Sequence, residues 1–185
     1  MFDLSEKQVV TEDDIKNIPL GAKLYLGEKS IVTPLAADLI AQNRLEILRK
    51  QPHTKRRPRV ALGSDHGGVE MKVALKELLS ELGIEFHDFG TYDTKPVDYP
   101  DYAHLVAGSI SQGSYDLGII IDGAGIGSCM VANKLPGVRA ALAYNAALAR
   151  NSREHNDANV LTLGGRFISI DQMRDIVKVW ISTSI

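Results

Sequence analysis

The sequence has little cysteine and no long apolar run, and both absences exclude classes of protein. Cys129 is the single cysteine among 185 residues, so no intrachain disulfide can form and no cysteine cluster can hold zinc. No apolar run approaches the roughly 18 to 20 residues that a membrane-spanning helix needs. The amino terminus, MFDLSEKQVV, lacks the basic and apolar segments of a secretory signal. We therefore expect a cytoplasmic protein that does not bind membranes.

Positive charge is concentrated in one short segment. The net charge is −2, yet residues 49–59 (RKQPHTKRRPR) carry six basic groups and no acidic group, and the chain on either side of them is acidic. A basic run of this kind can bind nucleic acid. This one contains two prolines and no aromatic residue. We interpret it as a solvated linker and expect no nucleic-acid binding.

The main domain is predicted to follow this segment, with residues 49–58 as the linker and residues 59–185 as one α/β domain. Short apolar runs that end in glycine alternate with segments of helical periodicity. This alternation predicts an α/β fold, a five-stranded parallel sheet covered by helices on both faces in three layers. The predicted strands are RVALGS (59–64), IEFHDFG (84–90), YDLGIIID (115–122), VRAALAY (138–144) and NVLTLGG (159–165).

Residues 1–48 are predicted to form a small α/β appendage. A capped helical turn starts at Thr11, AKLYLGEKSIV resembles a pair of strands, and a helix follows with Thr33 as its cap and Pro34 in its first position. So short a segment has too little core to be stable alone. We therefore expect it to dock on the main domain, on a sister chain or on another partner.

Polar or glycine-rich segments follow three of the five strands. SDHGG (64–68) comes at the end of the first strand, DGAGIGS (122–128) at the end of the third and GGR (164–166) at the end of the fifth. The carboxyl ends of parallel strands meet at one edge of the sheet, where ligands bind. The sequence therefore predicts a binding site at this edge.

The glycine loop at residues 123–127, GAGIG, fits one of three uses. A dinucleotide-binding loop belongs to the first βα unit and needs an acidic residue about 20 positions later, whereas this loop follows the third strand and residues 143–147 read AYNAA. A Walker loop needs G-K-[ST], which is absent. The remaining use is an anion hole, in which backbone N–H groups converge on an oxyanion at a helix N-terminus.

Asp122 stands directly before this loop and has two candidate roles. As a base it could move a proton between the two carbons of an aldose–ketose pair, while the loop amides face the enediolate oxygens. As a structural residue it could accept hydrogen bonds from the loop amides and cap the following helix. The residues alone leave both roles open.

Several motifs together resemble the ribose-5-phosphate isomerase B and galactose-6-phosphate isomerase family. They are VALGSDHGG, GTYDTKPVDYPDYA, GAGIGSCMVANKLPGVRAALAY and SREHNDANVLTLGGR, and the resemblance covers residues 59–182. It implies a five-stranded Rossmann-like sandwich that works as a homodimer or homotetramer, with active sites between subunits. It also implies a sugar-phosphate substrate and no metal or nucleotide cofactor.

The resemblance further implies roles for individual residues. Asp122 and His155 would be catalytic, His155 as the acid that opens the sugar ring. Arg166 would contact a phosphate in a neighbouring subunit's site. The remaining substrate-binding residues would be Asp65, His66 beside the phosphate, the anion-hole residues Gly123, Ala124, Gly125, Ile126 and Gly127, and Asn156. Each role has a structural alternative: His66 could bond to backbone, His155 and Asn156 could cap their helix, and Arg166 could form a surface ion pair.

Three features depart from the family pattern. Many members have a cysteine base at the position of Asp122, and another branch has a glutamate at the position of Ser128. A threonine or serine that assists ring opening is replaced by Ala124. The usual carboxyl-terminal GGRH…R tail, whose arginines bind phosphate, is absent after VWISTSI.

These departures raise alternatives for the base and for the phosphate ligands. Cys129 is a rival base, although its place inside a helix favours a packing role. His66 and Arg166 could suffice for the phosphate, or Arg153 or residues 56–59 could replace the missing arginines. The substrate could also lack a phosphate.

The appendage has a resemblance of its own. TPLAADL, a spacer and LEI are similar to the leader of ethanolamine-utilisation cobalamin adenosyltransferases and of other proteins encoded with bacterial microcompartments. This implies association with a microcompartment. For the whole chain we expect a sugar-phosphate aldose–ketose isomerase of the ribose 5-phosphate type that acts through a cis-enediolate. The alternatives are a scaffold that has lost catalysis and an isomerase or epimerase of a different sugar.

Overall fold

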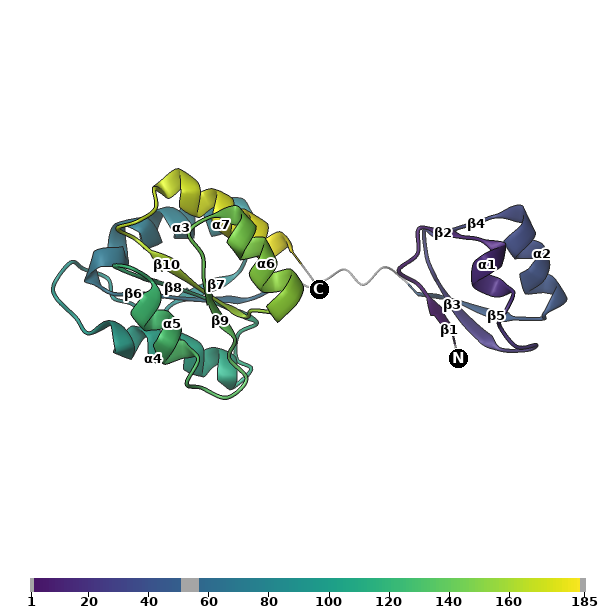
Figure 1. Cartoon of the computed structure of the whole chain (residues 1–185), viewed down its shortest axis with the longest axis horizontal. Coiled ribbons are helices and arrows are strands. Elements are labelled where there is room, and N and C mark those ends of the chain that lie inside the picture. The colour runs from purple at the N-terminus through teal and green to yellow at the C-terminus, as the bar shows by residue number, and fades with distance from the viewer. Residues whose placement is uncertain (1, 51–56, 184–185) are drawn as a thin grey trace. The chain divides into compact units, whose positions relative to one another are not determined.

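The computed structural model describes residues 2–50 and 57–183, which fall into two units, residues 1–56 and residues 57–185 (Figure 1). Most of the predicted linker, residues 51–56, lies outside the described residues. At its ends the structure differs from the prediction. Residues 49 and 50 complete a strand of the first unit, and the guanidinium of Arg57 donates to the carbonyls of Leu82 and Gly83 in the second.

The amino-terminal unit contains two small parallel sheets. The larger has the order β1–β3–β5, from Phe2–Leu4, Lys23–Gly27 and Glu46–Lys50, and the smaller pairs β2 (Val9–Val10) with β4 (Ile31–Val32). The segment predicted as a strand pair does contain β3 and β4, but these strands pair with other strands and not with each other. Neighbouring strands in parallel sheets are joined by long crossover connections. Strands close in sequence, such as β3 and β4, therefore need not pair with each other as they would in a hairpin.

Two short helices complete the core of this unit. Helix α1 (Glu12–Ile15) begins after Thr11 with a capping box, and α2 (Pro34–Gln42) begins after Thr33, whose hydroxyl accepts a hydrogen bond from the Ala36 amide at 3.3 Å. Both predicted helix starts are confirmed. The fully or largely buried apolar residues of the unit are Val10, Ile15, Ile18, Leu24, Leu26, Ala36, Ile40 and Leu45.

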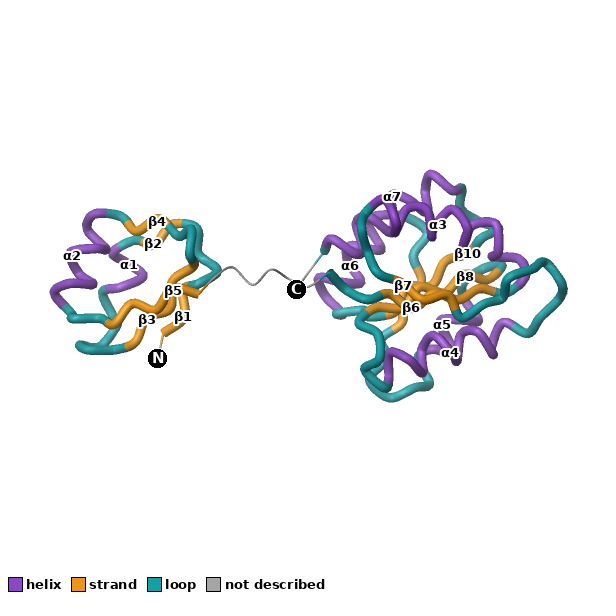
Figure 2. The backbone as a smooth tube through the Cα atoms, turned by 180° about the vertical axis from the view of Figure 1, so that it is seen from behind, coloured by secondary structure: helices purple, strands orange, loops and turns teal. Residues whose placement is uncertain are grey.

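The second unit is built on a five-stranded parallel sheet with the order β7–β6–β8–β10–β9, which confirms the predicted fold. Its helices form one layer on each face: α3, α6 and α7 on one side, α4 and α5 on the other (Figures 1 and 2). The strands are β6 (Val60–Ser64), β7 (Phe86–Asp88), β8 (Leu117–Asp122), β9 (Ala140–Leu142) and β10 (Val160–Gly164). The helices are η1 (His66–Gly68), α3 (Val69–Glu81), α4 (Tyr99–Ser111), α5 (Ile126–Ala132), α6 (Ala146–Asn156) and α7 (Ile170–Ser182).

The central strand β8 explains why the sheet is stable. All six of its residues are buried, and it pairs with β6 on one side and β10 on the other. Each isoleucine of the run Ile119 to Ile121 is almost fully removed from water, which contributes about 1.5–3 kcal/mol per side chain. The strand ends at Asp122, so its packing fixes where that carboxylate lies. No helix among the described residues is long and apolar enough to cross a membrane.

Candidate active site

Three segments meet at the carboxyl edge of the sheet, as their order after the strands predicts. The Asp65 amide, which follows β6, donates to the carbonyl of Ile121 in β8 at 3.1 Å. The Gly165 amide, which follows β10, donates to the carbonyl of Asp122 at 2.8 Å, and the Arg166 amide donates to Gly123 at 3.1 Å. The SDHGG segment, the glycine loop and the GGR segment therefore form one continuous surface.

Asp65 holds the first of these segments in shape. Its Oδ1 accepts hydrogen bonds from the amides of Gly67 at 2.9 Å and Gly68 at 3.0 Å, so the side chain caps η1. Gly68 must be a glycine because a β-carbon there would lie 2.5 Å from the carbonyl oxygen of Ile121. Oδ1 of Asp65 thus has a structural role. The predicted contact with substrate remains a prediction, and it would involve Oδ2.

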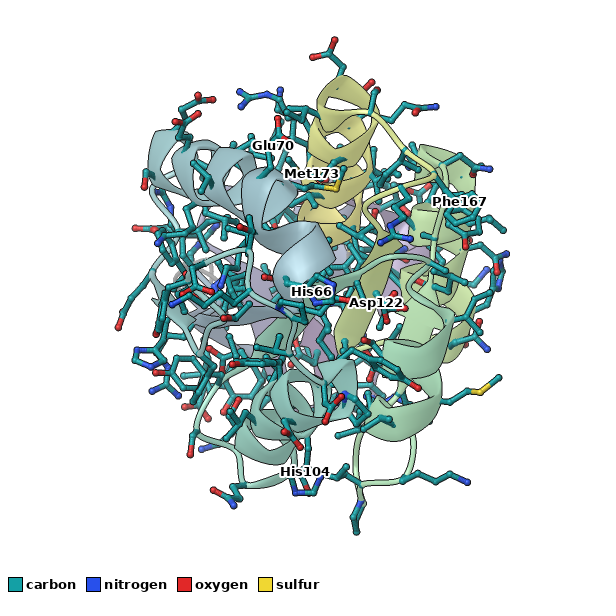
Figure 3. The ribbon with its side chains drawn as sticks, turned by 90° about the vertical axis from the view of Figure 1, so that its left-hand side faces the viewer. His66, Glu70, His104, Asp122, Phe167 and Met173 are labelled. Atoms are coloured by element: carbon teal, nitrogen blue, oxygen red, sulfur yellow. The ribbon has the colours of Figure 1, made fainter. Side chains whose placement is uncertain are left out.

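His66 is half-buried beside Asp122 at this edge (Figure 3). Its Nδ1 accepts a hydrogen bond from the amide of Val97 at 3.3 Å. One ring nitrogen of His66 is therefore bonded to the backbone, as the structural alternative for this residue predicted. No hydrogen bond within the described residues engages the other nitrogen, Nε2, so it remains available to a ligand.

The carboxylate of Asp122 occupies the centre of its own glycine loop. Its Oδ1 accepts from the amides of Ala124, at 2.8 Å, and Gly125, and its Oδ2 accepts from the amide of Ser128 at 3.0 Å and the Ser128 hydroxyl at 2.5 Å. The side chain is 5% exposed. A carboxylate has about four lone-pair positions, and all are engaged here. Of the two roles considered for Asp122, the structure therefore shows the structural one: the carboxylate accepts hydrogen bonds from its own loop and caps the helix that follows.

The anion hole is consequently smaller than the prediction of Gly123 to Gly127. The amides of Ala124 and Gly125 point at Asp122, whereas the amides of Gly123 and, at the start of α5, of Ile126 and Gly127 donate no hydrogen bond within the described residues. The first N–H groups of a helix are free donors for an anion.

Two tyrosines that sequence reasoning missed line the loop. A β-carbon on Gly127 would lie 2.6 to 2.8 Å from the ring and hydroxyl of Tyr99, so the ring lies directly over that glycine. The hydroxyl of Tyr144 donates to the Ala124 carbonyl at 2.6 Å. A signal was present for Tyr99: it opens helix α4, and helices after parallel strands begin at the carboxyl edge.

Arg166 lies at the glycine loop of its own chain. A β-carbon on Gly123 would be 3.6 Å from its Nε and 3.7 Å from its Cδ. The resemblance implied a role in a neighbouring subunit's site, whereas this side chain borders the loop that follows β8. The residue is exposed, and no ion pair within the described residues holds its guanidinium.

His155 and Asn156 do not join these residues in one chain. Helix α6 begins near the carboxyl edge after β9 and runs back, so its last turn lies where β10 begins. Eleven residues of helix span about 16 Å. Both residues are exposed at the opposite edge from Asp122. Within one chain, therefore, neither residue contacts the glycine loop.

The alternatives for phosphate ligand and base are also placed. The Arg153 guanidinium donates to the carbonyls of Ala158 at 2.6 Å and Thr183 at 3.2 Å and lies 5.4 Å from the Trp180 ring, and burial lowers its pKa. It cannot reach the glycine loop of its own chain. The Cys129 Sγ donates to the Ala140 carbonyl at 3.4 Å, so the thiol faces β9 as a packing residue.

Comparisons with known proteins find relatives of the second unit. Residues 60–185 match the model of a family described as Ribose/Galactose Isomerase. The chain is 47% identical over 126 residues to the "Putative sugar phosphate isomerase YwlF" of Bacillus subtilis, which covers 68% of this chain and 85% of that protein. It is 39% identical over 123 residues to "Ribose-5-phosphate isomerase B" of Escherichia coli, covering 66% and 83%.

Solved structures give the same result. Ribose-5-phosphate isomerase B of Clostridium thermocellum has 45% identity and a TM-score of 0.68, over 69% of this chain and 86% of that one. The enzyme of Mycoplasma genitalium, solved with bound ribulose-5-phosphate, has 38% identity and a TM-score of 0.66, over 69% and 85%. The match of family model, sequence and fold over the same residues means that this chain belongs to the ribose/galactose isomerase family.

Proposed function

We propose that the protein is an aldose–ketose isomerase of a sugar phosphate of the ribose 5-phosphate type. The observation that carries the proposal is the convergence of Asp122, His66 and Arg166 on one glycine loop, in a chain whose relatives are named as such isomerases. Reaction through a cis-enediolate needs a base, donors for the enediolate oxygens and groups that bind phosphate. This edge of the sheet holds a candidate for each.

Asp122 is the proposed base. It would take the proton from carbon 2 of the open-chain aldose and return it to carbon 1, while the hydroxyl proton moves from oxygen 2 to oxygen 1. One oxygen of the Asp122 carboxylate must first release a hydrogen bond, because all four lone-pair positions of the carboxylate are engaged. The Ser128 hydroxyl is the partner that can turn away, since a hydroxyl rotates and a backbone amide does not.

The other proposed roles follow from position. The free amides of Ile126 and Gly127 would donate to the enediolate oxygens, and His66 and Arg166 would bind the phosphate. Asp65, Gly123, Ala124 and Gly125 would shape the pocket.

A second copy would complete the site. We propose that His155 of one subunit opens the sugar ring bound by another, with Asn156 holding a substrate oxygen. Exposed apolar side chains support such a contact face: Ile126, Met130, Leu148 and Phe167 belong to segments that begin at this edge and are 48 to 68% exposed. Large exposed apolar groups mark surfaces where proteins associate. A homodimer is the smallest assembly that meets this need.

Isomerisation of a panel of pentose and hexose phosphates, together with the unphosphorylated sugars, tests the proposal. Asp122→Asn removes the carboxylate base and keeps an Oδ1 that can accept from the loop amides. We expect its kcat to fall at least about a hundredfold. Asp175→Asn, which removes an exposed carboxylate on α7, is the matched control and should keep full activity. An unchanged rate in Asp122→Asn would move the base elsewhere, with Cys129 the next residue to replace.

A binding protein without catalysis is the second candidate, and the saturated Asp122 carboxylate favours it. It predicts that sugar phosphates bind, by calorimetry, but that no member of the panel turns over.

We also propose that the amino-terminal unit serves docking or assembly with microcompartment proteins. Val9 and Ile31 are partners in the smaller sheet and are 49% and 66% exposed, which gives this unit an uncovered apolar pair. Residues 57–185 alone should turn over substrate as fast as the whole chain but no longer co-sediment with microcompartment shells. Equal co-sedimentation of both forms would contradict this role.

A further inference from the structure

His66 is placed by a loop that lies largely within the motif GTYDTKPVDYPDYA, residues 90–103. Residues 89–97, here called the flanking loop, follow β7, and the amide of Val97 donates to Nδ1 of His66 at 3.3 Å. An amide can only donate, so Nδ1 must carry the lone pair. The neutral imidazole then holds its proton on Nε2. The geometry thus presents an N–H, and not a lone pair, to the open side of His66.

The near end of the flanking loop is fixed to β6, the strand that precedes this histidine. The Ser64 amide donates to the Gly90 carbonyl at 2.8 Å, and the Thr91 amide donates to the Ser64 carbonyl at 2.8 Å. Ser64 is the last residue of β6, two positions before His66. The loop therefore contacts this strand at its start and His66 at its end.

A buried lysine secures the loop from behind. The Nζ of Lys72, on α3, donates to Oδ1 of Asp88 at 2.6 Å and to the carbonyl of Thr91 at 2.6 Å, and it lies 5.2 Å from the ring of Tyr92. Its side chain is only 3% exposed. A buried ammonium without partners is very unfavourable, so these contacts must persist as long as the fold does. Burial lowers the pKa of Lys72.

We propose that Lys72 is a positioning residue, which acts through the flanking loop to hold His66 as a fixed Nε2–H donor toward an acceptor oxygen of the ligand, such as a phosphate oxygen. The identity of that oxygen rests on the proposed function, but the tautomer does not.

Lys76 provides a matched control within the same ion-pair cluster. Its Nζ contacts the other oxygen of Asp88 at 3.2 Å, and its side chain is 39% exposed. Within the described residues it makes no hydrogen bond to the flanking loop. Lys72→Met and Lys76→Met thus remove the same charge beside the same carboxylate, but only the first removes a bond to the loop that places His66.

Long-range ¹H–¹⁵N spectra of the whole chain labelled at histidine read the tautomer directly, without ligand. We expect the Nε2–H form for His66 in the wild type and in Lys76→Met, and a mixture of both tautomers in Lys72→Met. Titration with inorganic phosphate should give binding weakened about fivefold or more in Lys72→Met, the loss of roughly one well-placed hydrogen bond. The change in Lys76→Met should stay below about twofold.

Two results overturn the proposal. An Nδ1–H tautomer of His66 in the wild type does so whatever the variants show. Unchanged tautomer and phosphate affinity in Lys72→Met also do so, and Lys72→Gln replaces that variant if it fails to fold. If the tautomer is as expected but no sugar phosphate is isomerised, the proposed function fails and the positioning by Lys72 stands.

Discussion

The Ser128 hydroxyl donates to Oδ2 of Asp122 at 2.5 Å, inside the loop where the sequence predicted a substrate oxyanion. The same oxygen accepts the Ser128 amide, so one residue engages it twice. The family patterns that resemble this chain have either a cysteine at the first of these positions or a glutamate at the second. In this chain both positions are polar, and Asp122 and Ser128 are hydrogen-bonded to each other. A substitution at one of them is therefore expected to change the environment of the other.

Removal of the Ser128 hydroxyl should separate its structural effect from any effect on turnover. Ser128→Ala loses a buried hydrogen bond to a charged group, which lowers the free energy of unfolding by about 1.5–3 kcal/mol. It also frees one lone pair of Asp122, so kcat per folded molecule should be equal to or higher than in the wild type. Urea denaturation and steady-state kinetics measure the two effects. A large fall in kcat would instead give the hydroxyl itself a part in the chemistry.

The ion pair behind the flanking loop should make stability depend on acid. Burial works against the Asp88 carboxylate, but hydrogen bonds from Lys72, the Gly90 amide and Lys76 outweigh it and hold the pKa of Asp88 below its ordinary 3.8. A depressed carboxylate pKa means that the unfolded state binds the proton more readily, so this stabilisation is complete above about pH 3.8 and is lost as the pH falls through the folded value. Asp88→Asn should therefore be less stable than the wild type at neutral pH, with the difference shrinking below that point. A constant difference down to pH 2.5 would contradict the assignment.

Two glycines with similar backbone angles should respond differently to a methyl group. Gly125 has φ of 78°, and a β-carbon there would lie 2.5 Å from Leu142 and 2.9 Å from the Leu163 backbone. Gly137 has φ of 76° and nothing within 4 Å. Gly137→Ala should cost about 1–2 kcal/mol, the strain of the left-handed conformation alone. Gly125→Ala should cost clearly more and also reduce turnover, because the loop must move. Equal costs in urea denaturation would show that the loop can relax.

The position of His155 predicts that two inactive variants can restore each other. In a mixed dimer of Asp122→Asn and His155→Ala, one site carries both changes and the other carries neither. Random exchange of subunits should restore roughly a quarter of wild-type activity from two preparations that are inactive alone. The control is each variant taken separately through the same exchange. No recovery, with mixed dimers present by native mass spectrometry, would mean that both residues act in one chain.

The strand and helix pattern could be predicted because it depends on local apolar periodicity. The buried run that ends at Asp122, and the caps at Thr11 and Thr33, are visible in the sequence and are present in the structure. The convergence of three segments at one edge also follows from parallel topology alone.

Other features depend on contacts between distant residues, which the sequence does not reveal. The pairing of β3 and β4 with other strands is set by crossovers in space. Whether the Asp122 carboxylate faced a substrate or its own loop depended on φ and ψ at the glycines. The contact between Val97 and His66 spans 31 positions and involves a backbone amide, for which no residue type is a signal.

The length of α6 has a consequence for how this protein could change in evolution. One residue inserted into its eleven would turn His155 by about 100° around the helix axis and move it about 1.5 Å along it. The three segments at the carboxyl edge of the altered chain would be untouched. In the proposed assembly, the activity lost would be that of the site in another subunit. In that assembly the length of α6 in one subunit would determine where His155 lies in the active site of its neighbour.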